Sequence, residues 1–193
     1  MKSVILGSNS PNRLSLLKSI GIKNIEVISP NIDETEFKHE KPAQIAKRLS
    51  IQKMEKLLSL EIKDGLIITA DSVASVGIKS LPKAETKEDV INCLKQISGK
   101  KVLVHTGVCV ASRESGKLIS KVVKTEIKVK RLTTKEIEWY ADSGEGTSKA
   151  GGFSILGLFQ VFTISINGQV SNVVGLPLYE TKNMLESFGY NFK

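Results

Sequence analysis

Short apolar runs alternate with longer stretches of helical periodicity along this chain of 193 residues. Residues 66–70 show no polar alternation, which predicts a strand buried on both faces. Between residues 42 and 58, Ile45, Leu49 and Met54 recur on one face of a predicted helix. Strands are also expected at residues 4–6, 24–28, 102–111 and 118–130. Further helices are expected from residues 11 to 21, from 86 to 99, from 133 onwards and from 178 to 188.

Turn residues separate these elements. Ser10 and Pro11 are typical of a capped helix start, and residues 113–116 suit a hairpin turn. Asn167-Gly168 lies between apolar runs at 159–166 and 169–174, which predicts a second hairpin. Residues 29–41 and the glycine-rich stretch 144–152 are expected to be loops.

The order of elements indicates an α/β fold with a mixed, largely central sheet flanked by helices, because hairpins are mixed with strand–helix alternation. No repeat, low-complexity tract or linker divides the chain, so a single domain over residues 1–193 is expected. The first strand is not followed by G-x-G-x-x-G, which argues against dinucleotide binding.

Composition narrows the classes of partner. The net charge is +8, but only four of the 28 basic residues are arginine and aromatic residues make up 5%. Base readout favours arginine and single-strand binding favours aromatics, so no nucleic-acid partner is expected. A positive surface would instead steer a small anionic substrate. No apolar run approaches the roughly 18 residues of a membrane span, so we expect a cytoplasmic protein without a membrane partner. Two cysteines without metal-ligand spacing are expected to be buried thiols.

Three features could carry chemistry. Asp71 follows the buried strand 66–70, where a carboxylate could cap a turn, bind a metal or act as a general base. The turn Ser8-Asn9-Ser10 leads into a helix N-terminus, which suits either an anion or simple capping. Lys149 lies in the glycine-rich loop, which could bring its ammonium to a phosphate, although any single lysine is more often a solvated surface residue.

Several stretches, taken together and in order, resemble the Maf-like proteins. They are LGSNSPNRLSLLKSIG from residue 6, IDE from 32, ADSV from 70, ISGKKVLVHTGV from 97, GEGTSKAGGFSILG from 144 and VVGLPLYET from 173. The resemblance covers nearly the whole chain. It implies a two-lobed Maf/ITPase-like fold with a cleft, and a possible homodimer.

The resemblance also implies an activity: hydrolysis of a nucleoside triphosphate, possibly a modified one, to the monophosphate and pyrophosphate. It further implies a divalent cation, Mg²⁺ or Mn²⁺, and possible roles in nucleotide-pool cleansing and cell-division arrest. Asp71 matches the family's catalytic proton acceptor, and Glu34 with Asp71 would bind the metal. The residues that would bind substrate are Ser8, Ser10, Arg13, Lys53, Lys83 and Lys149.

The chain departs from the family pattern at six positions. At three positions that tune base choice, Asn12, Ser72 and Leu156 replace the family's Arg, Thr and Gln. Elsewhere Leu81, Val102 and Ser148 replace a Lys, a His and an Asp. A family base preference therefore does not carry over. The changes at Leu81, Val102 and Ser148 motivate an alternative, a catalytically weakened nucleotide-binding regulator of septum formation. A nucleic-acid binder, motivated only by charge, is the third hypothesis.

Overall fold

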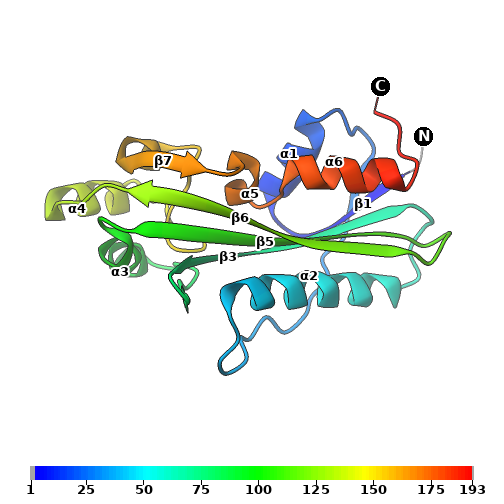
Figure 1. The fold of residues 1–193 in the computed structure, drawn as a ribbon, viewed down its shortest axis with the longest axis horizontal. Coiled ribbons are helices and arrows are strands. Elements are labelled where there is room, and N and C mark those ends of the chain that lie inside the picture. Colours follow the sequence, from blue (N-terminus) through cyan, green and yellow to red (C-terminus); the bar gives the residue numbers. More distant parts are fainter. Residues whose placement is uncertain (1–2, 193) are drawn as a thin grey trace.

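A computed structural model describes residues 3–192, so the expected domain 1–193 includes residues 1, 2 and 193, which lie outside the described part. One seven-stranded sheet runs through the molecule in the order β2-β1-β3-β5-β6-β7, with β4 paired to β3 (Figure 1). The strands are β1 Val4–Gly7, β2 Ile25–Val27, β3 Leu66–Val76, β4 Lys79–Ser80, β5 Lys101–Ser112, β6 Leu118–Val129 and β7 Thr163–Asn167. The helices are α1 Pro11–Ser19, α2 Pro42–Leu58, α3 Lys87–Ile97, α4 Thr134–Asp142, α5 Val170–Val174 and α6 Leu178–Ser187, with a 3₁₀ helix at Leu158–Phe162.

The sheet is mixed, as the sequence predicts. Strand β1 is parallel to both β2 and β3, whereas β3, β5, β6 and β7 follow one another in antiparallel pairs. The turn between β5 and β6 falls at residues 113–116, so the first predicted hairpin is confirmed.

Helices cover both faces of the sheet. Figure 1 shows α2 along one face, and α1, α5 and α6 along the other. Side chains alternate accordingly: Ile5 and Ile67 pack with Met54 of α2, while Leu6 and Ile68 pack in the core on the opposite face. The absence of polar alternation in residues 66–70 therefore has the expected cause, burial on two sides.

Helix α2 approaches the sheet most closely over Gly107 of β5. A Cβ atom added at Gly107 would lie 2.1 Å from the carbonyl oxygen of Ala46 on α2. Only glycine leaves room for this helix backbone, so the position sets how deeply α2 sits on β3 and β5.

A second core cluster lies at the end of the molecule that carries α3, α4 and β7 (Figure 1). Tyr140 and Phe159 are fully buried there, with ring centroids 5.7 Å apart, and Phe162 packs edge-on against both rings. Two capping boxes, at Thr86 and Thr133, begin α3 and α4 as predicted.

The second predicted hairpin is wrong. Residues 158–162 form a 3₁₀ helix, because its turn places both Phe159 and Phe162 in the aromatic cluster. After Gly168 the chain forms α5 instead of a returning strand. Gly168 packs against Thr125, where a Cβ would lie 2.7 Å from the Thr125 hydroxyl, and Gln169 donates its backbone N–H to that hydroxyl. Tertiary contacts to β6 thus decide this segment.

Strand β3 is longer than predicted, since it continues to Val76 and places Asp71 in its interior. Among residues 3–192, none of the helices combines the length and apolar character that crossing a bilayer requires.

Candidate active site

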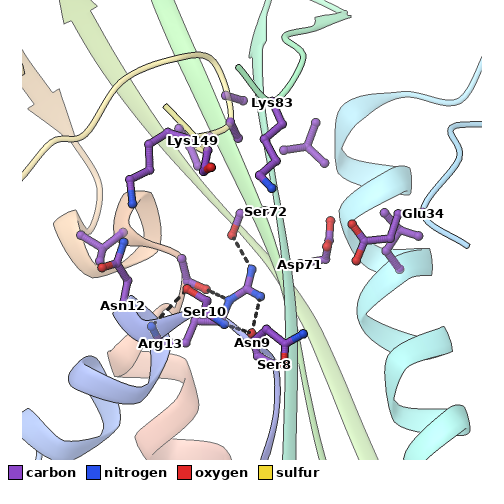
Figure 2. Close-up of a pocket in the computed structure, with 18 of the residues that line it drawn as sticks. Ser8, Asn9, Ser10, Asn12, Arg13, Glu34, Asp71, Ser72, Lys83 and Lys149 are labelled. Atoms are coloured by element: carbon purple, nitrogen blue, oxygen red, sulfur yellow. Dashed lines mark hydrogen bonds between the residues drawn. The ribbon is translucent and has the colours of Figure 1, made fainter. Parts of the chain in front are cut away.

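A cavity of about 850 Å³ opens between the two ends of the molecule. Its walls come from the start of α1, the loop before α2, the inner side of α2, the middle of β3 and the loop 148–156 (Figure 2). All of the site residues expected from the sequence line it: Ser8, Ser10, Asn12, Arg13, Glu34, Lys53, Asp71, Ser72, Lys83, Lys149 and Leu156. The fold thus brings together residues that lie far apart in the sequence. The roles assigned to them remain predictions.

Asp71 reaches the cavity because a neighbouring strand ends early. Strand β1 stops at Gly7, which pairs with Thr69. Two residues further on, Asp71 has β5 on one side, where it pairs with Gly107, and no β1 on the other. A carboxylate inside a buried strand thereby lies beside the carboxyl end of a parallel neighbour, the position where open α/β sheets bind ligands.

Two carboxylates meet one ammonium group beside α2. The Lys53 Nζ lies 2.6 Å from Oδ1 of Asp71 and 2.7 Å from Oε1 of Glu34. Lys53 and Asp71 are buried, whereas the Glu34 side chain is 59% exposed at the cavity. A buried charge needs such a partner, because desolvation alone would disfavour it.

The same carboxylate pair suits a hard divalent cation. Carboxylate oxygens are the protein ligands that Mg²⁺ prefers, and they converge here on one cationic atom. No group of three or more His, Cys, Asp or Glu side chains forms a metal cluster within residues 3–192. A cation held by Glu34 and Asp71 would therefore take its other ligands from water and from a bound phosphate, the usual pattern for Mg²⁺.

The loop that carries Glu34 is fastened to α2. The Arg48 guanidinium binds both carboxylate oxygens of Glu40, at 2.8 and 2.7 Å, and the carbonyl oxygen of Thr35 at 3.1 Å. It also lies 4.0 Å from the centre of the Phe37 ring. Hydrogen bonds to Arg48 lower the pKa of Glu40. Arg48 thus fixes the loop that presents Glu34 to the cavity.

The start of α1 forms the opposite wall. Ser10 is the N-cap residue, Pro11 occupies the first turn, and the Ser10 hydroxyl accepts the backbone N–H of Arg13. The Ser8 hydroxyl accepts the backbone N–H of Ser10 at 3.1 Å. The predicted capped junction is confirmed, and it directs a helix N-terminus at the cavity, where an anion is favoured.

Arg13 is held by three bonds from its guanidinium group (Figure 2). It donates to the carbonyl oxygen of Gly175 at 2.8 Å, to the Ser8 hydroxyl at 3.0 Å and to the Ser72 hydroxyl at 3.3 Å. Burial lowers the pKa of Arg13, and the negative charge of Asp71 opposes that shift. Arginine remains charged in proteins, so the cavity contains an oriented cation.

Lys83 and Lys149 come together through backbone pairing. Ala84 donates its N–H to the Lys149 carbonyl at 3.1 Å, and Gly151 donates to that of Pro82 at 2.9 Å. The Lys83 ammonium is 3.2 Å from Glu85. No ion pair or side-chain hydrogen bond joins Lys149 to any residue in 3–192, so its ammonium is uncommitted at the cavity (Figure 2).

The departures from the family pattern fall in different places. Leu81 is buried in the cavity wall, whereas Val102 lies wholly inside the core next to α3 and α4 and does not line the cavity. Ser148 takes a positive φ of 63° and donates its N–H to Ala84. Leu156 is 60% exposed at the cavity and has no hydrogen-bonding group.

Sequence reasoning missed three residues behind Arg13. Gly175 supplies a carbonyl acceptor, and Thr106 and Asn172 support Ser72 from within the core. Gly175 and Thr106 lie in stretches that resemble the family, so a signal was present for them. Asn172 falls in the run 169–174, for which the sequence predicts a strand, and nothing in that local pattern singles out its side chain.

The cavity lies at the end of a parallel strand and at a helix N-terminus. Its lining includes three carboxylates and four cationic side chains: Glu34, Glu36, Asp71, Arg13, Lys53, Lys83 and Lys149. This arrangement defines an α/β protein with a cavity whose chemistry suits a polyanionic ligand. The chain belongs to the Maf-like protein family, whose model matches residues 3–188.

Curated relatives match over nearly all of the chain. A protein from Rickettsia felis named nucleoside triphosphate pyrophosphatase is 44% identical over 97% of this chain and 93% of its own length. A protein from Mesorhizobium japonicum named dTTP/UTP pyrophosphatase is 41% identical over 98% of this chain and 93% of its own length. Among solved structures, that of a HAM1 protein from Coxiella burnetii covers 97% of this chain and 100% of its own, with 14% identity and a TM-score of 0.47.

Proposed function

We propose that this protein is a nucleoside triphosphate pyrophosphatase, which releases pyrophosphate and a nucleoside monophosphate. One observation carries the proposal: the buried Asp71 carboxylate shares a cavity with the oriented Arg13 and the uncommitted Lys149. Cations on opposite sides of a triphosphate would neutralise it, while a carboxylate remains near the phosphorus atom to take a proton. The names of the relatives from Rickettsia felis and Mesorhizobium japonicum support the same activity.

Asp71 is the proposed proton acceptor. Attack on a phosphoryl group requires water to lose a proton, and a carboxylate within hydrogen-bond reach of that water can accept it. Lys53 holds the Asp71 side chain in one orientation through the 2.6 Å contact. Because Lys53 is itself buried, this contact also restricts where the carboxylate can turn.

Mg²⁺ or Mn²⁺ is the proposed cofactor, with Glu34 and Asp71 as its protein ligands. When bound, such an ion polarises phosphoryl oxygens and neutralises charge on the triphosphate. Arg13, Lys53, Lys83 and Lys149 would bind the remaining phosphate charge, together with the Ser8 and Ser10 turn. The exposed Glu34 lets an ion reach the pair from the cavity.

The base would lie against the apolar part of the cavity near Phe153 and Leu156. The Leu156 side chain cannot donate or accept a hydrogen bond. The side-chain amide of the family's Gln is therefore not available at this position to select the base. Asn12 is half-buried at the same cavity and offers both a donor and an acceptor. We therefore infer that Asn12 contributes more than Leu156 to base choice. The Ser72 hydroxyl is bonded to Arg13 and Thr106.

A screen of canonical and modified nucleoside triphosphates with Mg²⁺ or Mn²⁺ tests the proposal, with pyrophosphate and monophosphate both measured. Turnover of at least one nucleotide that is lost in Asp71→Asn is the expected result. Orthophosphate as the product, or full activity in Asp71→Asn, contradicts the proposal. Tight nucleotide binding without turnover would instead favour the alternative, a nucleotide-binding regulator of septum formation. The changes at Leu81, Val102 and Ser148 motivate that alternative.

A further inference from the structure

A continuous chain of buried polar groups runs from the cavity into the core behind Arg13. Arg13 donates to the Ser72 hydroxyl at 3.3 Å, and the Ser72 and Thr106 hydroxyls are 2.9 Å apart. The Thr106 hydroxyl donates to the backbone carbonyl of Asn172 at 2.9 Å. Thr106 and Asn172 are both fully buried, so these bonds are shielded from water.

One arrangement of the hydroxyl protons lets every bond in this chain form at once. Thr106 has one hydroxyl proton, and the Asn172 carbonyl can only accept, so that proton goes to Asn172. Ser72 must then donate to Thr106. This leaves the Ser72 oxygen as an acceptor for Arg13, which has donors alone. In this arrangement each hydroxyl proton has an acceptor.

The far end of the chain is anchored to the sheet. The Asn172 side-chain amide donates to the Val104 carbonyl on β5 and to the Thr125 hydroxyl on β6, each at 3.1 Å. Thr125 also donates to the Gln169 carbonyl at 3.1 Å. Helix α5 is thus fixed against β5 and β6, and the carbonyl that Thr106 uses has a defined position.

The guanidinium group has five N–H donors, and the bonds to Gly175, Ser8 and Ser72 use three of them. The other two have no partner among residues 3–192. Since Arg13 lines the cavity, these two N–H groups, one on each terminal nitrogen, are the donors left for a ligand there. A two-point contact with phosphate depends on the plane of the guanidinium, which the bonds to Ser72 and Gly175 set.

We propose that Thr106 is a positioning residue that orients Arg13, through Ser72, for two-point contact with the triphosphate of the substrate. This inference rests on the proposed function, because it assigns Arg13 a phosphate ligand. Thr106 does not line the cavity, so a ligand bound there would not contact it. Its hydroxyl, and not its bulk, is the feature that matters.

Three variants separate this role from a structural one. Thr106→Val removes the hydroxyl at nearly constant volume, and Thr106→Ser keeps it. Thr181→Val is the matched control, since Thr181 is equally buried and its hydroxyl donates to the Pro177 carbonyl at 2.8 Å, on α6 and away from the cavity. Inorganic tripolyphosphate is the probe, with its Kd measured by calorimetry, and kcat and KM are measured on the best nucleotide.

We expect Thr106→Val to raise the Kd of tripolyphosphate about tenfold, and to lower kcat/KM by a similar factor. Thr106→Ser is expected to restore binding to within about threefold of wild type. Both valine variants should lower the melting temperature, but Thr181→Val should leave the Kd unchanged. In an Arg13→Met background, Thr106→Val should weaken binding by less than about twofold, because the group it orients is gone.

Three results would overturn the proposal: equal binding by Thr106→Val and wild type, equal losses in the presence and absence of the Arg13 side chain, or no binding of tripolyphosphate by wild type. Failure of the proposed function looks different. Wild type would then hydrolyse no nucleotide, while Thr106→Val still weakened tripolyphosphate binding only when Arg13 is present.

Discussion

Lys53 and Asp71 form a buried ion pair in the cavity wall, with 2.6 Å between Nζ and Oδ1. Glu34 is a second partner for the same ammonium at 2.7 Å, so Lys53 stays paired when one carboxylate is removed. Asp71→Asn is therefore expected to fold, with turnover at least about 100-fold lower because the proton acceptor is lost. Steady-state pyrophosphate release and a thermal melt test this. Undiminished turnover would contradict the role of Asp71.

The proposed metal role of Glu34 has a matched control in the preceding residue, Asp33. Asp33 is exposed and does not line the cavity. It accepts hydrogen bonds from the Thr35 hydroxyl and backbone N–H, which lower its pKa. We expect Glu34→Gln to raise the Mg²⁺ concentration for half-maximal activity about tenfold, since one carboxylate ligand is lost. Asp33→Asn should leave it unchanged. Calorimetric titration of Mg²⁺ gives a second readout, and equal effects of the two substitutions would argue against Glu34 as a ligand.

The Lys149 ammonium lies at the cavity and forms no ion pair with any residue in 3–192. Removing this side chain should therefore weaken substrate binding without unfolding the protein. We expect Lys149→Met to raise KM about tenfold, the order of one charged hydrogen bond. Lys23→Met is the comparison, because Lys23 is exposed and does not line the cavity. An unchanged KM in Lys149→Met would remove this lysine from the phosphate site.

The close approach of α2 to β5 predicts a loss of stability in Gly107→Ala. The new Cβ would lie 2.1 Å from the Ala46 carbonyl oxygen, so α2 must shift outward. We expect the free energy of unfolding to fall by about 1–3 kcal/mol, as for other overpacked cores. Because Gly107 pairs with Asp71, activity should fall as well. Urea unfolding measures the first effect. If Gly107→Ala is as stable as wild type, α2 can move outward without loss of stability, which contradicts this prediction.

Glu136 predicts a pH-dependent contribution to stability. Its hydrogen bond to Lys130, at 2.5 Å, and its capping bonds to Thr133 lower the pKa of Glu136 to about 2. A depressed pKa means that ionised Glu136 stabilises the fold above its ordinary pKa of 4.5, and that this contribution is lost as the pH falls towards 2.

The comparison of wild type with Glu136→Gln should therefore show a stability difference at pH 7 that shrinks between pH 4.5 and 2. Glu138→Gln, an exposed change on the same helix, is the control for the general effect of removing one carboxylate. Urea unfolding at several pH values measures both. A difference that stays constant with pH would mean that Glu136 acts through shape and not through charge.

Local sequence signals predicted most elements, because each had its own cause in neighbouring residues. The Ser10 cap, the capping boxes at Thr86 and Thr133, and the unbroken apolar run of β3 all depend on contacts within a few residues or on burial from both sides. The hairpin prediction for residues 159–174 was wrong because the conformation of this segment depends on residues far away in the sequence. The Phe162 ring packs edge-on against the Tyr140 ring, and the Gln169 backbone N–H donates a hydrogen bond to the Thr125 hydroxyl on β6.

The sequence by itself determined which types of residue occur at the site, because stretches that resemble the Maf-like family follow one another in the same order along this chain. Only the tertiary structure decided their geometry. Asp71 lies in mid-strand and still reaches a cavity, because β1 ends at Gly7. Arg13 depends on Thr106, 93 positions away, because the intervening strands bring a hydroxyl under Ser72. Such bonds join residues far apart in the chain, and local patterns do not encode them.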